Sequence, residues 1–172
     1  MKTPKPNECT AGFSLAELLI ALLLFTVIAT LTVTNTTFLH RFILQTEVEK
    51  LFSHCLAQQY KALMSGSNQR IVFDPKHGSY SIDNHRYKLP DDIQFGATDS
   101  AKGPPSAPSK KITKPVTWKN NTLVCHASGI IQPGTVYLTT RNKTQSWALS
   151  NGIGTVSFLR KYRYDGKWHY VP

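Results

Sequence analysis

The residue whose chemistry says most about this chain is Glu17, a carboxylate inside a long apolar run. Residues 13–33 contain no other ionisable side chain, and a helix of about 20 such residues crosses a bilayer. Placing an acid in lipid costs about 3 kcal/mol on insertion scales, so an intramembrane acid marks a function by default. We therefore expect Glu17 to meet a cation or a hydrogen-bond donor inside the membrane.

The segment before that run sets the expected orientation. Residues 1–12 are polar and carry Lys2 and Lys5, which predicts a cytoplasmic amino end under the positive-inside rule. A secretory signal has its small cleavage residue after the apolar region. Here the small residue, Gly12, comes directly before it, so we expect the run to be retained as a single membrane span.

The stretch Gly-Phe-Ser-Leu-Ala-Glu-Leu-Leu at residues 12–19 resembles the leader junction of type IV pilins and type II secretion pseudopilins. The resemblance implies that a prepilin peptidase cuts between Gly12 and Phe13 and that Phe13 is then N-methylated. Glu17 becomes the fifth mature residue and is implied to pair with the amino group of Phe13 on a neighbouring subunit. The implied location is the inner membrane, with a periplasmic C-terminal domain. The implied partners are other pilin or pseudopilin subunits, the peptidase and the inner-membrane assembly platform.

A simple signal anchor is the alternative interpretation. It would tether a periplasmic binding domain, with Glu17 close enough to the membrane interface to be tolerated. Glycine directly before the run, together with an acid at the fifth position after it, favours the pilin-like interpretation.

The pattern predicts one long helix in two parts. Residues 1–12 are the expected leader, 13–34 the membrane half of the helix and 35–66 an amphipathic half. In the second half apolar side chains recur at steps of three and four, at Leu39, Phe42, Ile43, Val48, Leu51, Phe52, Cys55, Leu56, Tyr60, Leu63 and Met64. Gly66 follows them and predicts the helix end. Residues 67–172 are enough for one β domain only.

Short runs with a period of two predict antiparallel strands in that domain. We expect them at 70–73, 79–82, 86–89, 93–95, 116–118, 122–126, 135–140, 146–149, 155–164 and 167–171. Asp165-Gly166 between the last two predicts a tight hairpin. A segment near 97–114, rich in proline, serine and lysine, predicts a mobile surface loop.

The expected fold class is α+β, with a long N-terminal helix packed on an antiparallel domain of two sheets. This order of elements resembles the GspH/FimT-type minor pseudopilins, which have glycine-containing segments before their last strands. Residues 124–129 and 152–156 are similar to those segments.

No catalytic or cofactor motif accompanies these elements. The sequence has no nucleophile elbow, glycine-rich phosphate loop or Cys-x-x-Cys, so we predict neither an enzyme nor a bound cofactor. The six histidines, at positions 40, 54, 77, 85, 126 and 169, show no metal-ligand spacing, and we expect scattered surface side chains. Cys55 and Cys125 allow either a disulfide in an oxidising periplasm or two buried thiols.

Positive charge is concentrated at the carboxyl end. Residues 13–100 hold seven Lys and Arg against eight Asp and Glu, whereas residues 101–172 hold eleven against one. One interpretation is a minor pilin that binds DNA for uptake. Its candidate contacts are Arg160, Lys161, Arg163 and Lys167, because the aromatics among them can stack on bases while cations meet phosphates. Strand alternation favours a second interpretation, a solvated basic face over a half-buried aromatic one. A third is the docking of an acidic protein.

Overall fold

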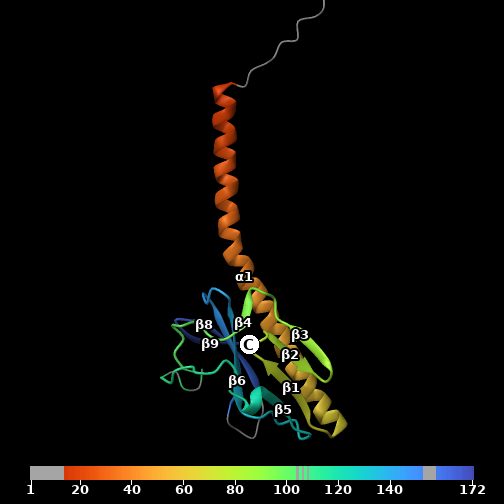
Figure 1. The fold of residues 1–172 in the computed structure, drawn as a ribbon. Helices are drawn as coiled ribbons and strands as arrows, with labels where there is room; N and C mark the ends of the chain where they lie inside the picture. The colour runs from red at the N-terminus through yellow and green to blue at the C-terminus, as the bar shows by residue number, and fades with distance from the viewer. Residues whose placement is uncertain (1–13, 104, 106, 108, 153–157) are drawn as a thin grey trace, which may run out of the picture. The chain divides into compact units, whose positions relative to one another are not determined.

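The computed structural model describes residues 14–103, 105, 107, 109–152 and 158–172, with backbone alone for residues 31–37. The chain divides into two compact units, Met1–Phe38 and Leu39–Pro172. One helix, α1 (Leu15–Ser65), has residues in both units (Figure 1). The expected long helix is confirmed. Gly66, at a φ of 60°, follows its last residue as a left-handed terminating residue.

In the N-terminal unit the helix is apolar and uncovered. Its large apolar side chains from Leu15 to Ile28 are 47–79% exposed. The hydroxyls of Thr26 and Thr30 donate to carbonyl oxygens one turn earlier, each at 2.8 Å, so the helix itself satisfies them. Among the residues whose side chains the structure describes, no helical stretch is both long and apolar enough to span a membrane.

The globular unit contains two antiparallel sheets, as expected. Their strand orders are β3-β2-β1-β5 and β4-β6-β7-β8-β9. The first sheet consists of β1 (Gln69–Asp74), β2 (Ser79–Ile82), β3 (His85–Lys88) and β5 (Thr122–Cys125). The second consists of β4 (Ile93–Phe95), β6 (Gly134–Thr140), β7 (Ser146–Asn151), β8 (Leu159–Asp165) and β9 (Lys167–Val171). Gly166, at a φ of 70°, makes the predicted turn between the last two strands.

Two predicted strands differ from the structure. Residues 116–118 form no strand, because Val116 makes only an isolated bridge to Val136 and a short 3-10 helix, η1 (Lys119–Asn121), follows. Trp118 leaves the sheet to bury its ring and donates its Nε1 proton to the carbonyl oxygen of Gln132 at 2.7 Å. Of the segment predicted at 155–164, the structure shows a strand from Leu159, the first residue of β8. Residues 153–157 lie outside the described residues, and they include most of the glycine segment 152–156.

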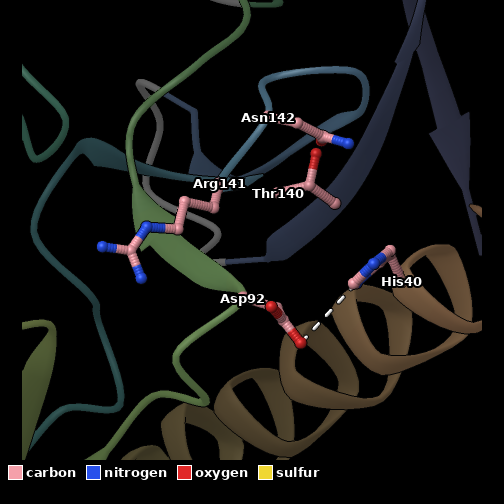
Figure 2. Close-up of a pocket in the computed structure, with 5 residues that line it drawn as sticks. All are labelled: His40, Asp92, Thr140, Arg141 and Asn142. Carbon is pink, nitrogen blue, oxygen red and sulfur yellow. Dashed lines mark ion pairs between the residues drawn. The ribbon is translucent and has the colours of Figure 1, made fainter.

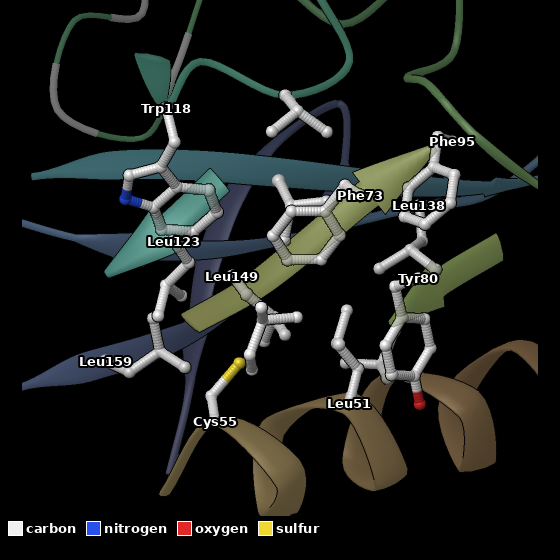
Figure 3. Packing of buried hydrophobic residues seen from close by; sticks show 14 of the residues in the cluster. Leu51, Cys55, Phe73, Tyr80, Phe95, Trp118, Leu123, Leu138, Leu149 and Leu159 are labelled. Atoms are coloured by element: carbon white, nitrogen blue, oxygen red, sulfur yellow. The ribbon is translucent and has the colours of Figure 1, made fainter. Parts of the chain in front are cut away.

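One hydrophobic core joins α1 to both sheets (Figure 3). On α1 the buried apolar side chains are Leu44, Val48, Leu51, Cys55 and Ala62. The sheets contribute Ile71, Phe73, Tyr80, Phe95, Leu123, Val136, Leu138, Trp147, Leu149 and Leu159, among others. The Phe73 ring stacks on Trp118 at a centroid distance of 5.7 Å and meets the edge of Phe95 at 5.9 Å. Each large side chain in such a core contributes about 1.5–3 kcal/mol.

The buried face of α1 is narrower than the sequence pattern predicted. Six of the apolar residues expected to recur on one face are 41–72% exposed: Leu39, Phe42, Leu56, Tyr60, Leu63 and Met64. At 3.6 residues per turn Leu39, Phe42, Tyr60 and Met64 lie on the side of the helix opposite the fully buried side chains, whereas Leu56 and Leu63 lie on its flank. We call these four residues, Leu39, Phe42, Tyr60 and Met64, the outer apolar surface of α1. The helix is therefore apolar on two opposite sides.

Residues 98–103 cross the outer face of the second sheet, and we call them the strap. The strap makes one hydrogen bond to each of three neighbouring strands. On β7, Ser146 Oγ accepts the backbone N–H of Thr98 at 2.7 Å. The Tyr164 hydroxyl on β8 donates to the carbonyl oxygen of Ser100, and Trp168 Nε1 on β9 donates to that of Gly103, each at 2.8 Å. Ala101 is only 7% exposed. The expectation of a loop that does not pack is therefore wrong for this part of residues 97–114.

An ion pair between a buried lysine and a partly exposed glutamate also joins α1 to the second sheet. The ammonium group of Lys161, on β8, lies 2.9 and 3.0 Å from the two carboxylate oxygens of Glu49. The same ammonium lies 4.9 Å from the centre of the Phe52 ring. Lys161 is 9% exposed, so Glu49 compensates a cation that water hardly reaches.

Removing the two aromatic donors to the strap should free it. The double variant Tyr164→Phe with Trp168→Phe loses two hydrogen bonds, worth about 1–3 kcal/mol together. We expect trypsin to cut after Lys102 faster in this variant, while cleavage after the distant Lys119 keeps its rate. Unchanged cleavage after Lys102 would show that these bonds do not hold the strap.

Removing the carboxylate beside Lys161 should destabilise the globular unit. Glu49→Gln leaves a buried ammonium group without its counter-charge, and we expect the free energy of unfolding to fall by about 1–3 kcal/mol. Adding Lys161→Met should recover most of the loss. The matched control is Lys61→Met, because the Lys61–Asp83 pair is 49% and 52% exposed and should contribute under about 1 kcal/mol. Equal effects of Glu49→Gln and the control, measured by denaturant titration with tryptophan fluorescence, would contradict the assignment.

Candidate functional site

Glu17 lies in the first turn of α1, where it forms a capping box with Ser14. The Ser14 hydroxyl oxygen accepts the backbone N–H of Glu17 at 3.2 Å, and Glu17 Oε2 accepts the backbone N–H of Ser14 at 3.4 Å. This reciprocal pair satisfies two donors that the start of a helix leaves open. The carboxylate also lies at the positive end of the helix dipole. Glu17 thus stabilises its own helix start.

The capping box was readable from the sequence and was missed by the sequence reasoning. Ser-x-x-Glu before an apolar run is its signature, and Ser14-Leu15-Ala16-Glu17 matches it. In the structure the bond from Ser14 engages Oε2, and no donor among the residues from Ser14 onward that the structure describes bonds the Oε1 atom of Glu17. Gly12 and Phe13 lie outside the described residues, so the cleavage site between them stays a prediction.

The basic residues near the carboxyl end do not form one surface. Arg160 and Arg163 are both exposed, but an odd spacing of three along β8 places them on opposite faces of the sheet. Lys161 is occupied by Glu49, a partner 112 positions away in the sequence. Lys167 is exposed in β9, where it lines a groove beside the strap. A nucleic acid needs a continuous track of cations, and this arrangement interrupts it.

A pocket of about 290 Å³ lies beside α1 (Figure 2). His40 Nδ1 lies 3.6 Å from Asp92 Oδ2, which makes an ion pair when the imidazole is protonated. The guanidinium group of Arg141 extends away from this pair and donates to the carbonyl oxygen of Asp91 at 3.3 Å. The hydroxyl of Thr140 lies 3.2 Å from that of Thr144. These groups are paired with structural neighbours, and nothing in the arrangement activates a nucleophile.

One histidine is not the surface side chain that the sequence suggested. His54 on α1 is half-buried, with Nδ1 3.0 Å from the Tyr80 hydroxyl and its ring 4.7 Å from that of Tyr87. Burial lowers the pKa of His54 below its usual value of 6.5, and nearby Lys50 lowers it further against the opposing effect of Glu47. His54 is therefore neutral near pH 7 and packs α1 against the first sheet.

The two cysteines of the globular unit are buried free thiols, the second of the two predicted alternatives. Burial raises the pKa of Cys125 to about 11 and raises that of Cys55 as well. Since the thiolate is the reactive form, neither is a nucleophile near neutral pH. Within the described residues no three His, Cys, Asp or Glu side chains converge where a metal ion could bind.

Comparison with known proteins adds a structural likeness. Neither a protein-family model nor a curated protein matches the sequence. Among solved structures, the chain is similar to the minor pseudopilin EpsH from the type 2 secretion system of Vibrio cholerae, at 12% sequence identity and a TM-score of 0.48. The match covers 67% of this chain and 94% of that one. A likeness at this level does not by itself identify a family or a function.

Proposed function

We propose that this chain is a minor pilin or pseudopilin, a structural subunit of a type II secretion pseudopilus or a type IV pilus-like filament. It is held in the inner membrane by a single span, with its amino end cytoplasmic and its globular unit periplasmic. A prepilin peptidase removes residues 1–12 and methylates Phe13. The subunit then enters a filament through the inner-membrane assembly platform.

The observation that carries the proposal is the difference in burial between the two ends of α1. The same continuous helix is apolar and uncovered near its start, with Glu17 in its first turn, and is buried in the core of an α+β unit near its end. A helix that had only to complete the core would have no need of the 16 residues from Leu15 to Thr30. Exposed apolar surface of this extent marks an interaction with lipid or with other helices.

The outer apolar surface of α1 supports helix–helix assembly. Residues such as Phe42, Tyr60 and Met64 are 60%, 66% and 72% exposed although they belong to a helix whose opposite side is fully buried. Burial of such side chains contributes about 1.5–3 kcal/mol each. Neighbouring subunits that bundle through their helices would cover this surface.

Glu17 supplies the register of that bundle in the proposal. Its Oε2 atom caps its own helix, and its Oε1 atom can accept the ammonium group of Phe13 on a neighbouring subunit. Attraction between such charges is strong where water is excluded. An acid that remained unpaired in lipid would oppose assembly. The pairing therefore favours the one axial offset between adjacent helices that brings Glu17 next to the amino group of Phe13.

The experiment must separate the charge of Glu17 from its capping role. Glu17→Gln keeps the capping box, because glutamine at this position bonds the same N–H, but it removes the charge. We expect this variant to be processed normally and to be lost from sheared filament fractions by at least about tenfold, the effect of roughly 1.4 kcal/mol. Immunoblots of the sheared and membrane fractions from the native host measure both steps.

Ser14→Ala is the matched control for the cap. It removes one half of the box, at a cost of about 1 kcal/mol to the helix start, and it keeps the charge. We expect it to be processed and incorporated. Normal incorporation of Glu17→Gln, or equal losses for Glu17→Gln and Ser14→Ala, would contradict a role for the charge in assembly.

A further inference from the structure

A groove lies between the strap and the β8–β9 hairpin, on the outer face of the second sheet. It has a volume of about 470 Å³, within the usual range of ligand sites, and is lined by Ser100, Lys102, Tyr164, Gly166, Lys167 and Trp168, together with Pro105. The ring nitrogen of Trp168 and the hydroxyl of Tyr164 both bond to strap carbonyls. The aromatic walls of the groove are therefore fixed before any ligand arrives.

The lining of the groove contains two cations and no carboxylate. Lys102 and Lys167 are both exposed and approach it from the strap and from β9. Asp165, the one acid after residue 101, stands opposite Lys167 in the register of β8 and β9, and it lines a different pocket with Arg41 and Arg163. Two cations with no carboxylate among the lining residues favour a ligand that carries negative charge.

The strand beside the groove has a free edge. β9 is the last strand in the order β4-β6-β7-β8-β9, so one side of its backbone is unpaired within the described residues (Figure 1). Its residues Lys167, His169 and Tyr170 are exposed. An unpaired edge can accept an extended chain as an additional strand. The lysine at its start opposes a basic strand there and favours an acidic one.

We infer that this groove and the free edge of β9 together form a docking site for an extended acidic peptide segment of a partner protein. The segment adds to β9 through main-chain hydrogen bonds and places its carboxylates at Lys102 and Lys167. A nucleic acid is a poorer match, because it cannot pair with a strand edge and because the rings of Tyr164 and Trp168 already pack on each other at 5.1 Å. This site is separate from the helix–helix contacts proposed for α1, because it is formed by the strap and the β8–β9 hairpin.

The test uses the full chain in neutral detergent micelles at low salt, with fluorescence anisotropy as the readout. The probe is a labelled peptide in which glutamate alternates with valine. We expect saturable binding that weakens at least about tenfold in the double variant Lys102→Glu with Lys167→Glu, because two attractions become repulsions. The control variant Lys76→Glu with Lys119→Glu has the same net charge, and it should bind within about twofold of the unaltered chain.

Two further probes decide the mode of binding. A version of the peptide with N-methyl groups on alternate backbone amides cannot pair with β9, and we expect it to bind about tenfold more weakly. A single-stranded oligothymidylate of equal charge should bind more weakly than the acidic peptide. The inference is overturned by absence of saturable peptide binding, by equal losses in the two double variants, by indifference to N-methylation, or by an oligothymidylate that binds as tightly.

Discussion

The structure of the globular unit depends on one face of α1, on which both sheets pack. Leu44, Val48 and Leu51 are fully buried there, at steps of four and three residues. The first sheet meets this face through residues such as Ile71 and Tyr80, and the second through residues such as Leu138 and Leu149. Neither sheet has a separate core, because both share one cluster with the helix, and the two sheets also meet directly where Phe73 contacts Phe95.

The contact between α1 and the second sheet includes one ion pair, between Glu49 and Lys161. Lys161 extends from β8 to Glu49, and its ammonium group lies over the Phe52 ring. Because this cation is paired and buried, it is removed from the basic surface that the sequence suggested. The strap has a similar effect on the opposite face, where it occupies the polar tips of Tyr164 and Trp168. The basic carboxyl end is thereby divided into separate parts, among them the exposed Arg160 and Arg163 and the groove at Lys102 and Lys167.

Sequence reasoning was accurate where a local pattern determines the structure. The continuous helix ending before Gly66, the strands near β1 and β6 and the turn at Gly166 all follow from periodicity and turn chemistry. It was less accurate where a long-range partner decides. Strict alternation did not predict the burial of Lys161, because its partner Glu49 comes from another element. Composition did not predict the strap, because the strap is held by bonds from its own backbone to aromatic side chains 64 and 65 residues away. On α1 the pattern merged two opposite apolar surfaces into one, because it placed Val48 and Leu51 on the same face as Leu39 and Phe42, and it left out the fully buried Leu44.

The claim on which the functional account depends is that the mature subunit begins directly before the apolar helix, with Glu17 near its new amino end. Mass spectrometry of the amino-terminal peptide of the protein, isolated from membranes of its native host, tests this most directly. The account predicts a peptide that starts at Phe13 and carries one N-methyl group. A peptide that starts at Met1, or at a residue after position 33, would contradict it.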